Sequence, residues 1–424
     1  NAIDKVFNKT RAEDRKVWLG DYDKHAVLTS SNLEVTYEDF IDKEMRHFSK
    51  YDCERSIPNL MDGLKTSLRK ILYSAFKKNL IKEIKVAQFS GYVSEHSGYH
   101  HGEMSLNKAI INLAQEFVGS NNINPLLPLG QFGTRLEGGK DSASERYIFT
   151  MLNSLTSFIF RNEDAPVLTY LDDDGHLVEP DYYVPIIPMI LVNGGKGIGT
   201  GFSYEGMSYN VNSIINYLKK YIKTGKKTVK IEPYYEGFTG SIIKLDNDGK
   251  KYIIKGKYQV INHNTIKITE LPIGTWTSPY KAFLEKLMED KTSKGKKKKP
   301  VVKSYNDCCT DTSVEFTVKL HLGVLPKLVS KKYSEHIDMV EKTFALYTTK
   351  STTNMYLFDE DQKLRKYETI YDIIDCYFPV RKQGYVTRKE YIIKHLEKIV
   401  MVLSNKARFI KEQCDDIIDL RKKK

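Results

Sequence analysis

The segment 131–147, QFGTRLEGGKDSASERY, contains residues suited to chemistry on a phosphate group. Its glycines allow backbone amides to approach an oxyanion closely, and its hydroxyls and cations add hydrogen-bond donors. These residues are Gly133, Gly138, Gly139, Ser142, Ser144, Arg135, Lys140 and Arg146. The segment therefore predicts phosphate binding.

Tyr147 ends this segment and is predicted to open a helix. A tyrosine hydroxyl, with an ordinary pKa of about 10, is a weak nucleophile unless a cation, a base or a metal assists it. The adjacent Arg146 could favour the ionised hydroxyl and stabilise a pentavalent phosphorane. From residue types alone, a purely structural tyrosine at a helix start stays an open alternative.

A second glycine-rich stretch, GGKGIGTG at residues 194–201, superficially resembles a phosphate loop but lacks its GKS or GKT ending. Within it, Ile198 stands between Gly197 and Gly199 as a bulky side chain on a slender backbone. Such a wedge can enter a base step and kink DNA. The alternative is a buried isoleucine that fills a small gap.

No metal site is predicted. His100 and His101 are adjacent at a predicted helix start, so their side chains point apart, and no third ligand stands at a supporting spacing. The three aspartates at 172–174 precede Gly175, which favours a hairpin turn over a magnesium cluster. The five cysteines show no paired spacing that would indicate zinc or a disulfide framework.

The composition favours a polyanionic partner. The 424 residues include 66 Lys and Arg against 54 Asp and Glu, a net charge of +12, and their number suggests two to four domains. A solvated basic surface is the alternative. The lysine-rich run 291–303 is expected to be a loop that contacts DNA, acts as a localisation signal or merely aids solubility. The longest apolar run, 182–192, contains two prolines and is too short to span a membrane.

The elements expected around these residues form a mixed α and β protein. A helix is predicted from Ser56 to Lys78 and another after Gly102, with a strand-like segment at 85–94 between them and a helical pattern at 147–160. Two helices separated by a strand suit a winged-helix module, although many α+β domains offer the same count.

Beyond Ser208 the chain is predicted to be rich in β-structure, and its end to be helical. A capping box at 387–390 is expected to open a long amphipathic helix whose partner lies outside this segment. The predicted strands are 229–231, 241–245, 251–255, 259–261, 265–269, 314–322 and 355–358, with turns at 246–249 and 262–264 and a helix at 334–344.

Together these residues resemble the breakage-reunion region of type IIA DNA topoisomerases of the eukaryotic and large-DNA-virus type. The resemblance covers essentially the whole chain. The matching stretches are ERSIPNLMDGLK (54–65), KVAQFSGYVSEHSGYHHGEMSL (85–106), NLAQEFVGSNN (112–122), QFGTRLEGGKDSASERYIFTML (131–152), VEPDYYVPIIPMILVNGGKGIGTGFS (178–203) and, more loosely, NKARFI (405–410). Bacterial relatives have a different histidine motif and lack the GGKDSA stretch.

The resemblance implies roles for individual residues. Tyr147 would be the nucleophile that forms a reversible 5′-phosphotyrosyl bond, Arg146 would stabilise the transition state, and Ile198 would intercalate and bend DNA. His100 and His101 would lie close to the reacting phosphate. The DNA-binding residues would be Lys65, Tyr99, His100, His101, Ser105, Arg135 and Lys140.

The resemblance also implies an α+β multidomain fold. Its parts would be a connector after a missing Toprim domain (1–49), a winged-helix domain (50–175), a β-rich tower (176–365) and a coiled-coil arm (366–424). Two chains would form a homodimer on double-stranded DNA for strand passage, relaxation and decatenation, with Mg²⁺ and ATP bound outside this segment. The isolated chain is expected to bind DNA but to cleave it poorly or not at all. An intracellular location is expected: the nucleus for a cellular protein, or the host cytoplasm or nucleus for a viral one.

Two departures from the family pattern stand out. Thr66 follows the GLK triplet where proline is usual, and Glu145 precedes the Arg-Tyr pair where proline is frequent. Either could tune geometry without removing the chemistry. Two other readings compete: a non-catalytic DNA-bending protein with the same fold, and a meiotic break-making nuclease, whose relatives lack the tower pattern.

Overall fold

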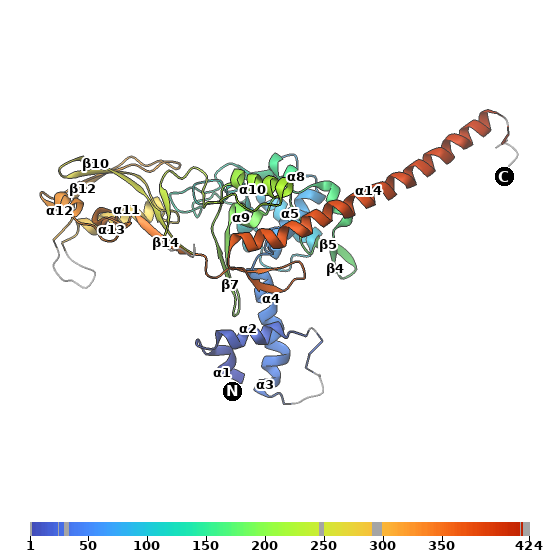
Figure 1. Cartoon of the computed structure of the whole chain (residues 1–424), viewed down its shortest axis with the longest axis horizontal. Helices are drawn as coiled ribbons and strands as arrows, with labels where there is room; N and C mark the ends of the chain where they lie inside the picture. Colours follow the sequence, from blue (N-terminus) through green and yellow to red (C-terminus); the bar gives the residue numbers. More distant parts are fainter. Residues whose placement is uncertain are drawn as a thin grey trace.

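The computed structural model describes residues 2–23, 25–28, 34–245, 250–290, 299–415 and 417–418. In Figure 1 a group of N-terminal helices lies below a central mixed body, a β-rich lobe extends to the left, and a long C-terminal helix extends to the right. The predicted mixed α+β class with a long C-terminal helix is confirmed. No described helix has both the length and the apolar character that a membrane span requires.

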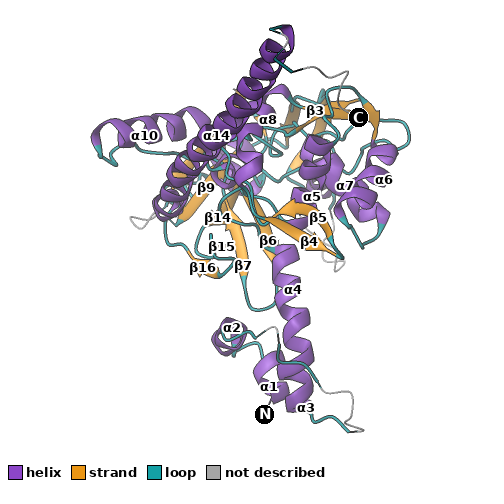
Figure 2. Cartoon of the chain, turned by 90° about the vertical axis from the view of Figure 1, so that its right-hand side faces the viewer, coloured by secondary structure: helices purple, strands orange, loops and turns teal. Residues whose placement is uncertain are grey.

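The N-terminal unit packs around a buried tryptophan. Trp18 is 4% exposed, and its Nε1 donates to Asp42 Oδ1 at 2.6 Å while Lys5 pairs with the same carboxylate. The last helix of the unit rises into the central body, as Figure 2 shows. The elements are α1 (Ala2–Phe7), α2 (Ala12–Gly20), α3 (Tyr37–Phe40), the π-helix η1 (Ile41–Met45) and α4 (Arg46–Ser56).

The central body surrounds a three-stranded antiparallel sheet with the order β1-β3-β2. Its elements are α5 (Thr66–Lys77), β1 (Ile84–Lys85), α6 (Val86–Ser97), α7 (Glu103–Ala114), β2 (Leu126–Leu129), β3 (Phe149–Leu152), α8 (Ser154–Ile159), the 3₁₀-helix η2 (Asn162–Val167), β4 (Tyr170–Asp173), β5 (His176–Pro180), α9 (Met189–Asn193), β6 (Gly195–Ile198), β7 (Ser203–Gly206) and α10 (Val211–Thr224). The strand pairs β4–β5 and β6–β7 form two separate hairpins.

The β-rich lobe has a second hydrophobic core, which includes Ile266, Phe316 and Phe344. Its sheets have the orders β10-β11-β13-β12 and β14-β9-β8, and β15 pairs with β16 beside the central body. The elements are β8 (Ser241–Lys244), β9 (Lys251–Lys255), β10 (Lys257–Asn262), β11 (Thr265–Glu270), α11 (Thr277–Met288), β12 (Val302–Asp307), β13 (Phe316–Leu320), α12 (Val324–Val329), α13 (Met339–Thr343), β14 (Tyr347–Ser351), β15 (Tyr356–Phe358) and β16 (Leu364–Lys366).

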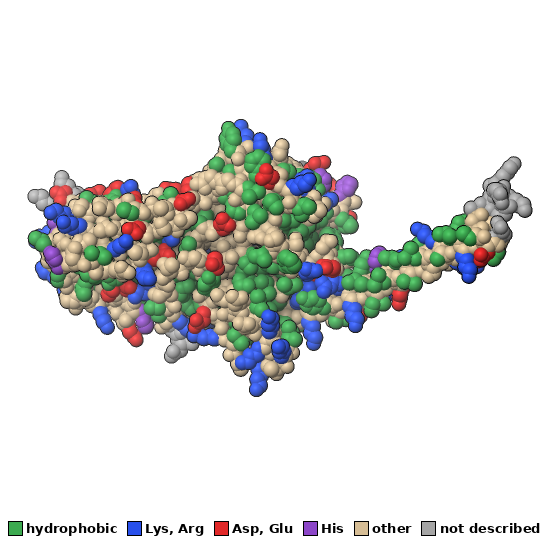
Figure 3. Space-filling view, turned by 90° about the horizontal axis from the view of Figure 1, so that it is seen from above, with side chains coloured by type: hydrophobic (Ala, Val, Ile, Leu, Met, Phe, Trp, Pro, Cys, Tyr) green, Lys and Arg blue, Asp and Glu red, His purple; other side chains and the backbone are tan. Residues whose placement is uncertain are grey.

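The final helix, α14 (Ile370–Cys414), is 45 residues long, and its buried residues lie in the first part of the helix, up to Arg381. Asp164 of η2 accepts from Arg381 Nη1 at 2.6 Å and from Arg388 Nη1 at 3.1 Å. Beyond these contacts apolar side chains remain exposed, including Leu396 at 53% and Leu403 at 56%. Figure 3 shows this apolar surface along the projecting arm.

Several predicted boundaries are wrong. The segment 57–65 is not helical, residues 86–97 form α6 instead of a strand, and α14 begins at Ile370 instead of Thr387. Segment 147–160 contains β3 before α8, and 229–231 is not a strand. The predicted helix 334–344 shrinks to Met339–Thr343. Residues 246–249 and 291–298, which carry a predicted turn and most of the lysine-rich loop, lie outside the described residues.

The misplaced start of α5 has a physical cause in side chains that compete with the helix. Asn59 Oδ1 accepts from Met61 N at 2.8 Å, and Asp62 Oδ1 accepts from Leu64 N at 2.9 Å. Such local bonds favour turns over helical hydrogen bonding. Gly63 has φ +71°, and a Cβ there would lie 2.6 Å from the backbone nitrogen of Ile190. The turn is therefore packed directly against α9.

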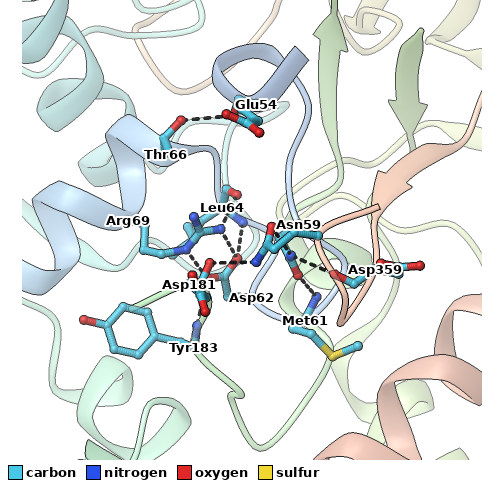
Figure 4. Close-up of polar contacts among 11 residues, drawn as sticks. Glu54, Asn59, Met61, Asp62, Leu64, Thr66, Arg69, Asp181, Tyr183 and Asp359 are labelled. Atoms are coloured by element: carbon cyan, nitrogen blue, oxygen red, sulfur yellow. Dashed lines mark hydrogen bonds and ion pairs between the residues drawn. The ribbon is translucent and has the colours of Figure 1, made fainter. Parts of the chain in front are cut away.

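A buried ion pair closes this turn, as Figure 4 shows. Arg69 Nε donates to Asp62 Oδ2 at 2.7 Å, and Arg69 Nη2 donates to Asp62 Oδ1 at 3.1 Å and to the carbonyl of Leu64 at 3.0 Å. Tyr183 N donates to the same carboxylate at 3.0 Å. The aspartate side chain is 0% exposed, so water does not solvate its negative charge. The hydrogen-bond donors around it stabilise that charge instead.

We expect Arg69→Met to lower the free energy of unfolding by about 3–5 kcal/mol, because it leaves the Asp62 carboxylate buried without its cation. Urea denaturation followed by circular dichroism measures the loss. Lys227→Met is the matched control, since the Lys227–Asp375 pair is about 40% exposed on each side and should cost less than about 1 kcal/mol. Equal losses in the two variants would contradict the assignment.

Candidate functional site

Tyr147 lies on an exposed turn that precedes β3, not at a helix start as predicted. It is 75% exposed, and the neighbouring Arg146 is also exposed. Tyr147 N donates to the carbonyl of Ser144 at 2.9 Å, which closes the turn. Both polar side chains are therefore presented to solvent.

The start of α6 holds this turn from both sides. The first amides of a helix have no partner within the helix and seek acceptors elsewhere. Here Val86 N donates to the carbonyl of Ile148 at 3.0 Å, and Ala87 N donates to the carbonyl of Glu145 at 3.2 Å. The two acceptors flank the Arg146–Tyr147 pair. The exposed pair thus stands on a fixed backbone.

The predicted phosphate cradle around the glycines of segment 131–147 is filled by protein. All three glycines have positive φ, and a Cβ would lie 2.3 Å from the Gln115 side chain at Gly139 and 2.3 Å from the Trp276 ring at Gly138. At Gly133 it would lie 2.6 Å from the backbone of Gly139. These glycines permit close packing of protein against protein. The space that the predicted oxyanion cradle needs at them is therefore occupied.

Arg135, predicted to bind DNA, is buried instead. It is 5% exposed, and its Nη2 donates to Glu270 Oε1 at 2.5 Å. Its guanidinium is therefore paired with the β-rich lobe, and little of the side chain is open to the predicted DNA contact. Lys140, from the same segment, is exposed as a DNA contact would require.

Ile198 lies at the end of β6 and is 69% exposed, which rules out the buried-isoleucine alternative. Its hairpin rests on the end of α4. A Cβ on Gly197 would lie 2.1 Å from the carbonyl oxygen of Ser56, and one on Gly199 would lie 3.0 Å from Cys53. The flanking glycines therefore allow the hairpin to lie directly on the helix.

Lys65 is attached to the same hairpin. Its Nζ donates to the carbonyl of Lys196 at 2.9 Å, and burial lowers the pKa of Lys65. Its half-buried side chain lies beside β6. Lys65 is thus bound to the hairpin that carries Ile198. Ser105, another predicted DNA contact, is exposed in the first turn of α7.

Tyr99, His100 and His101 lie between α6 and α7, at the opposite end of α6 from the Tyr147 turn. The 12 residues of α6 span about 18 Å at 1.5 Å per residue. Within one chain the two histidines therefore lie about one length of α6 away from the Tyr147 turn. Tyr99 is only 8% exposed and packs edge-on against His101, so its ring is not a surface contact.

The histidines have separate partners. His101 Nε2 lies 2.6 Å from Tyr51 Oη, and His100 Nε2 lies 3.2 Å from Asp173 Oδ2 in the β4–β5 hairpin. Burial, and then the nearby Arg55, lower the pKa of His101. Tyr51 and Arg55, four residues apart on α4, were missed by sequence reasoning. Their helical spacing was the available signal, but nothing local linked them to the histidines.

The aspartates at 172–174 form the predicted hairpin turn. Gly175 N donates to Asp172 Oδ1 at 2.7 Å, and Asp174 has φ +53°. Among the described residues, no group of three or more His, Cys, Asp or Glu side chains could hold a metal ion.

Comparison with known proteins gives consistent matches along the chain. Residues 55–424 match the family of the A subunit of DNA gyrase/topoisomerase IV, and residues 1–53 match the C-terminal associated domain of TOPRIM. The chain is 44% identical to DNA topoisomerase 2 of Plasmodium falciparum over 426 residues, covering 100% of the chain and 29% of that relative. It is 42% identical to human DNA topoisomerase 2-alpha over 434 residues, covering 100% of the chain and 28% of that relative.

A solved structure is also similar. The crystal structure of the Plasmodium falciparum topoisomerase II DNA-binding, cleavage and re-ligation domain superimposes with a TM-score of 0.90 at 45% identity. The match covers 100% of this chain and 56% of that one. The chain thus spans less than a third of the length of the curated relatives it matches.

We expect the imidazole of His101 to titrate below 6.5 and the Arg55→Gln variant to titrate higher, because burial and the Arg55 charge disfavour the imidazolium. NMR titration of histidine-labelled protein, assigned with a His101→Gln variant, measures both midpoints. Since the folded state holds His101 neutral, its linked stability is present above the ordinary pKa and falls as the pH drops below 6.5. A midpoint at or above 6.5 would contradict this description.

Proposed function

Because this chain belongs to the type IIA DNA topoisomerase family, we propose that it is the DNA-binding and cleavage core of such an enzyme. In the full-length protein it would make transient double-strand breaks for ATP-dependent strand passage, relaxation and decatenation. The observation that carries the proposal is the Arg146–Tyr147 pair, exposed on a turn whose flanking carbonyls are fixed by α6.

In the proposed reaction, Tyr147 Oη attacks the phosphorus of a DNA strand. The new Tyr147–phosphate bond forms at the 5′ end as the bond between phosphorus and O3′ breaks. The phenol proton is lost and O3′ takes up a proton, so that reversal restores the strand. The guanidinium of Arg146 stabilises the negative charge that develops on the phosphoryl oxygens. The preset turn lowers the entropic cost of bringing the hydroxyl to the phosphorus.

The surrounding elements support a DNA bed. Ile198 would intercalate from its hairpin, while Lys65 and Lys140 would contact the backbone, as would Ser105 and the two histidines. The domain division given by the family resemblance, from connector through winged helix and tower to coiled-coil arm, is part of this proposal, and the match of residues 1–53 to a TOPRIM-associated domain supports its first part. The proposal also includes a homodimer on duplex DNA, with Mg²⁺ and ATP bound outside this chain. The location would be the nucleus for a cellular protein, or the host cell for a viral one.

We expect the full-length protein to form a covalent DNA adduct on Tyr147 that is lost in Tyr147→Phe, since the variant lacks the nucleophilic oxygen. Labelled duplex with Mg²⁺, followed by denaturation and peptide mapping, detects the adduct. Arg146→Gln should lower the cleavage rate by about 10²–10³ through the lost charge stabilisation. Tyr37→Phe, at an equally exposed tyrosine, is the control and should cleave normally. DNA binding without any adduct would favour the non-catalytic DNA-bending protein.

We expect Ile198→Ala to remove a DNA kink of roughly 20–90°, because a methyl side chain cannot keep a base step unstacked. Fluorescence energy transfer between the ends of a short duplex reports the bend when the full-length protein is added. Ile222→Ala is the matched control, since Ile222 is 68% exposed on α10. If both variants bend DNA like the unsubstituted protein, Ile198 is not the wedge.

A further inference from the structure

Arg135 joins the Tyr147 segment to the β-rich lobe through a fully satisfied carboxylate. Glu270, at the end of β11, is 2% exposed. Its Oε1 accepts from Arg135 Nη2 at 2.5 Å and from Leu271 N at 2.9 Å, and its Oε2 accepts from Thr239 N at 3.1 Å and Thr239 Oγ1 at 3.0 Å. The guanidinium therefore binds an acceptor that is itself rigidly held.

The start of α11 makes a second contact with the same segment. Thr277 N donates to the carbonyl of Arg135 at 3.3 Å, and Ser278 N donates to the carbonyl of Leu136 at 3.0 Å. The indole of Trp276 covers Gly138 so closely that a Cβ there would lie 2.3 Å from the ring. The segment is thus bound through both a side chain and its backbone.

Gln115, at the end of α7, supports the segment from the central body. Its Nε2 donates both hydrogens, to the carbonyl of Phe132 at 2.8 Å and to the carbonyl of Gly139 at 3.1 Å. The residue is 7% exposed. The amide therefore links two positions of the loop, Phe132 and Gly139, that lie seven residues apart in the sequence.

Internal bonds connect these anchors to the Tyr147 turn. Asp141 accepts from Thr134 N at 2.9 Å and from Thr134 Oγ1 at 2.6 Å, and Ala143 N donates to the carbonyl of Gln131 at 2.9 Å. Two residues later, Glu145 meets the start of α6. A braced backbone thus runs from the β-rich lobe to the turn that carries Tyr147.

We propose that Arg135 and Gln115 are positioning residues that clamp residues 131–145 between the β-rich lobe and α7, and that this clamp places Tyr147 for reaction. The inference rests on the proposed function of Tyr147. Neither side chain touches the reacting atoms.

The first test follows the clamp itself in the 424-residue chain and requires no cleavage. The sequence has two tryptophans, so a Trp18→Phe background leaves Trp276 as the only one. Arg135→Met and Gln115→Glu should shift the Trp276 emission to longer wavelength and increase its quenching by acrylamide. Lys255→Met, which breaks the 2.5 Å Lys255–Glu341 pair between β9 and α13, is the matched control and should leave the Trp276 signal unchanged.

The second test separates positioning from binding in the full-length protein. At saturating duplex, Arg135→Met and Gln115→Glu should lower the cleavage rate on the order of tenfold to a hundredfold, as expected for a displaced reacting group. The affinity for DNA should remain unchanged. Arg135→Lys, which retains the charge, should recover part of the rate. If Arg135→Met does not fold, Arg135→Lys takes its place in both tests.

The outcomes distinguish this inference from the proposed function. Unchanged Trp276 emission, or normal cleavage despite a released Trp276, would overturn the clamp while leaving the Tyr147 chemistry intact. A loss of cleavage that equals the Lys255→Met loss would assign Arg135 to stability alone. If the unsubstituted protein forms no adduct, the proposed function fails, and a positioning role for a reaction fails with it, while the emission experiment still reports whether the contact exists.

Discussion

The buried carboxylate of Asp62 is the constraint on which the centre of the molecule depends. It accepts hydrogen bonds from the Arg69 side chain, from its own turn and from Tyr183 N, so that α5, the segment 57–65 and the chain after β5 are fixed together. The turn that it shapes brings Gly63 against α9, and α9 leads directly into the Ile198 hairpin. Loss of one partner of such a buried pair is costly because the remaining charge is left buried without compensation.

The two side chains that we propose to act on DNA are supported in a similar way. Tyr147 and Ile198 are each exposed, yet each stands on backbone held by close packing or by hydrogen bonds to a neighbouring helix. Glycine makes this support possible because it has no side chain where two backbone segments pack together, as at Gly197. It is not needed there to bind an anion. A polar or apolar group can therefore face a ligand without the mobility that exposure usually brings.

Much of the fold followed from local pattern. The helix α7, the hairpin at 172–175 and the strands β8, β9 and β11 agree with prediction because a single period or turn signal dominates each segment. Prediction was wrong where a distant partner decided the outcome. Nothing near Arg135 indicated Glu270, which is 135 positions away, and the Asx turns at 59–64 overrode a periodic leucine pattern. The candidate site residues came from residue type and from the family resemblance, whereas the separation of the histidines from Tyr147 along α6 required the structure.

Because α14 is held near its start, a small change of its tilt there would produce a larger displacement at its far end. From Arg388 to Cys414 the helix extends about 39 Å beyond its last contact with Asp164, at 1.5 Å per residue. A tilt of about 10° at that anchor moves the far end by about 7 Å, on the same 1.5 Å rise. Pro379, within the anchored part, removes one helical hydrogen bond where such a tilt would originate. Small rearrangements beside the central body thus become displacements larger than a helical turn at the tip.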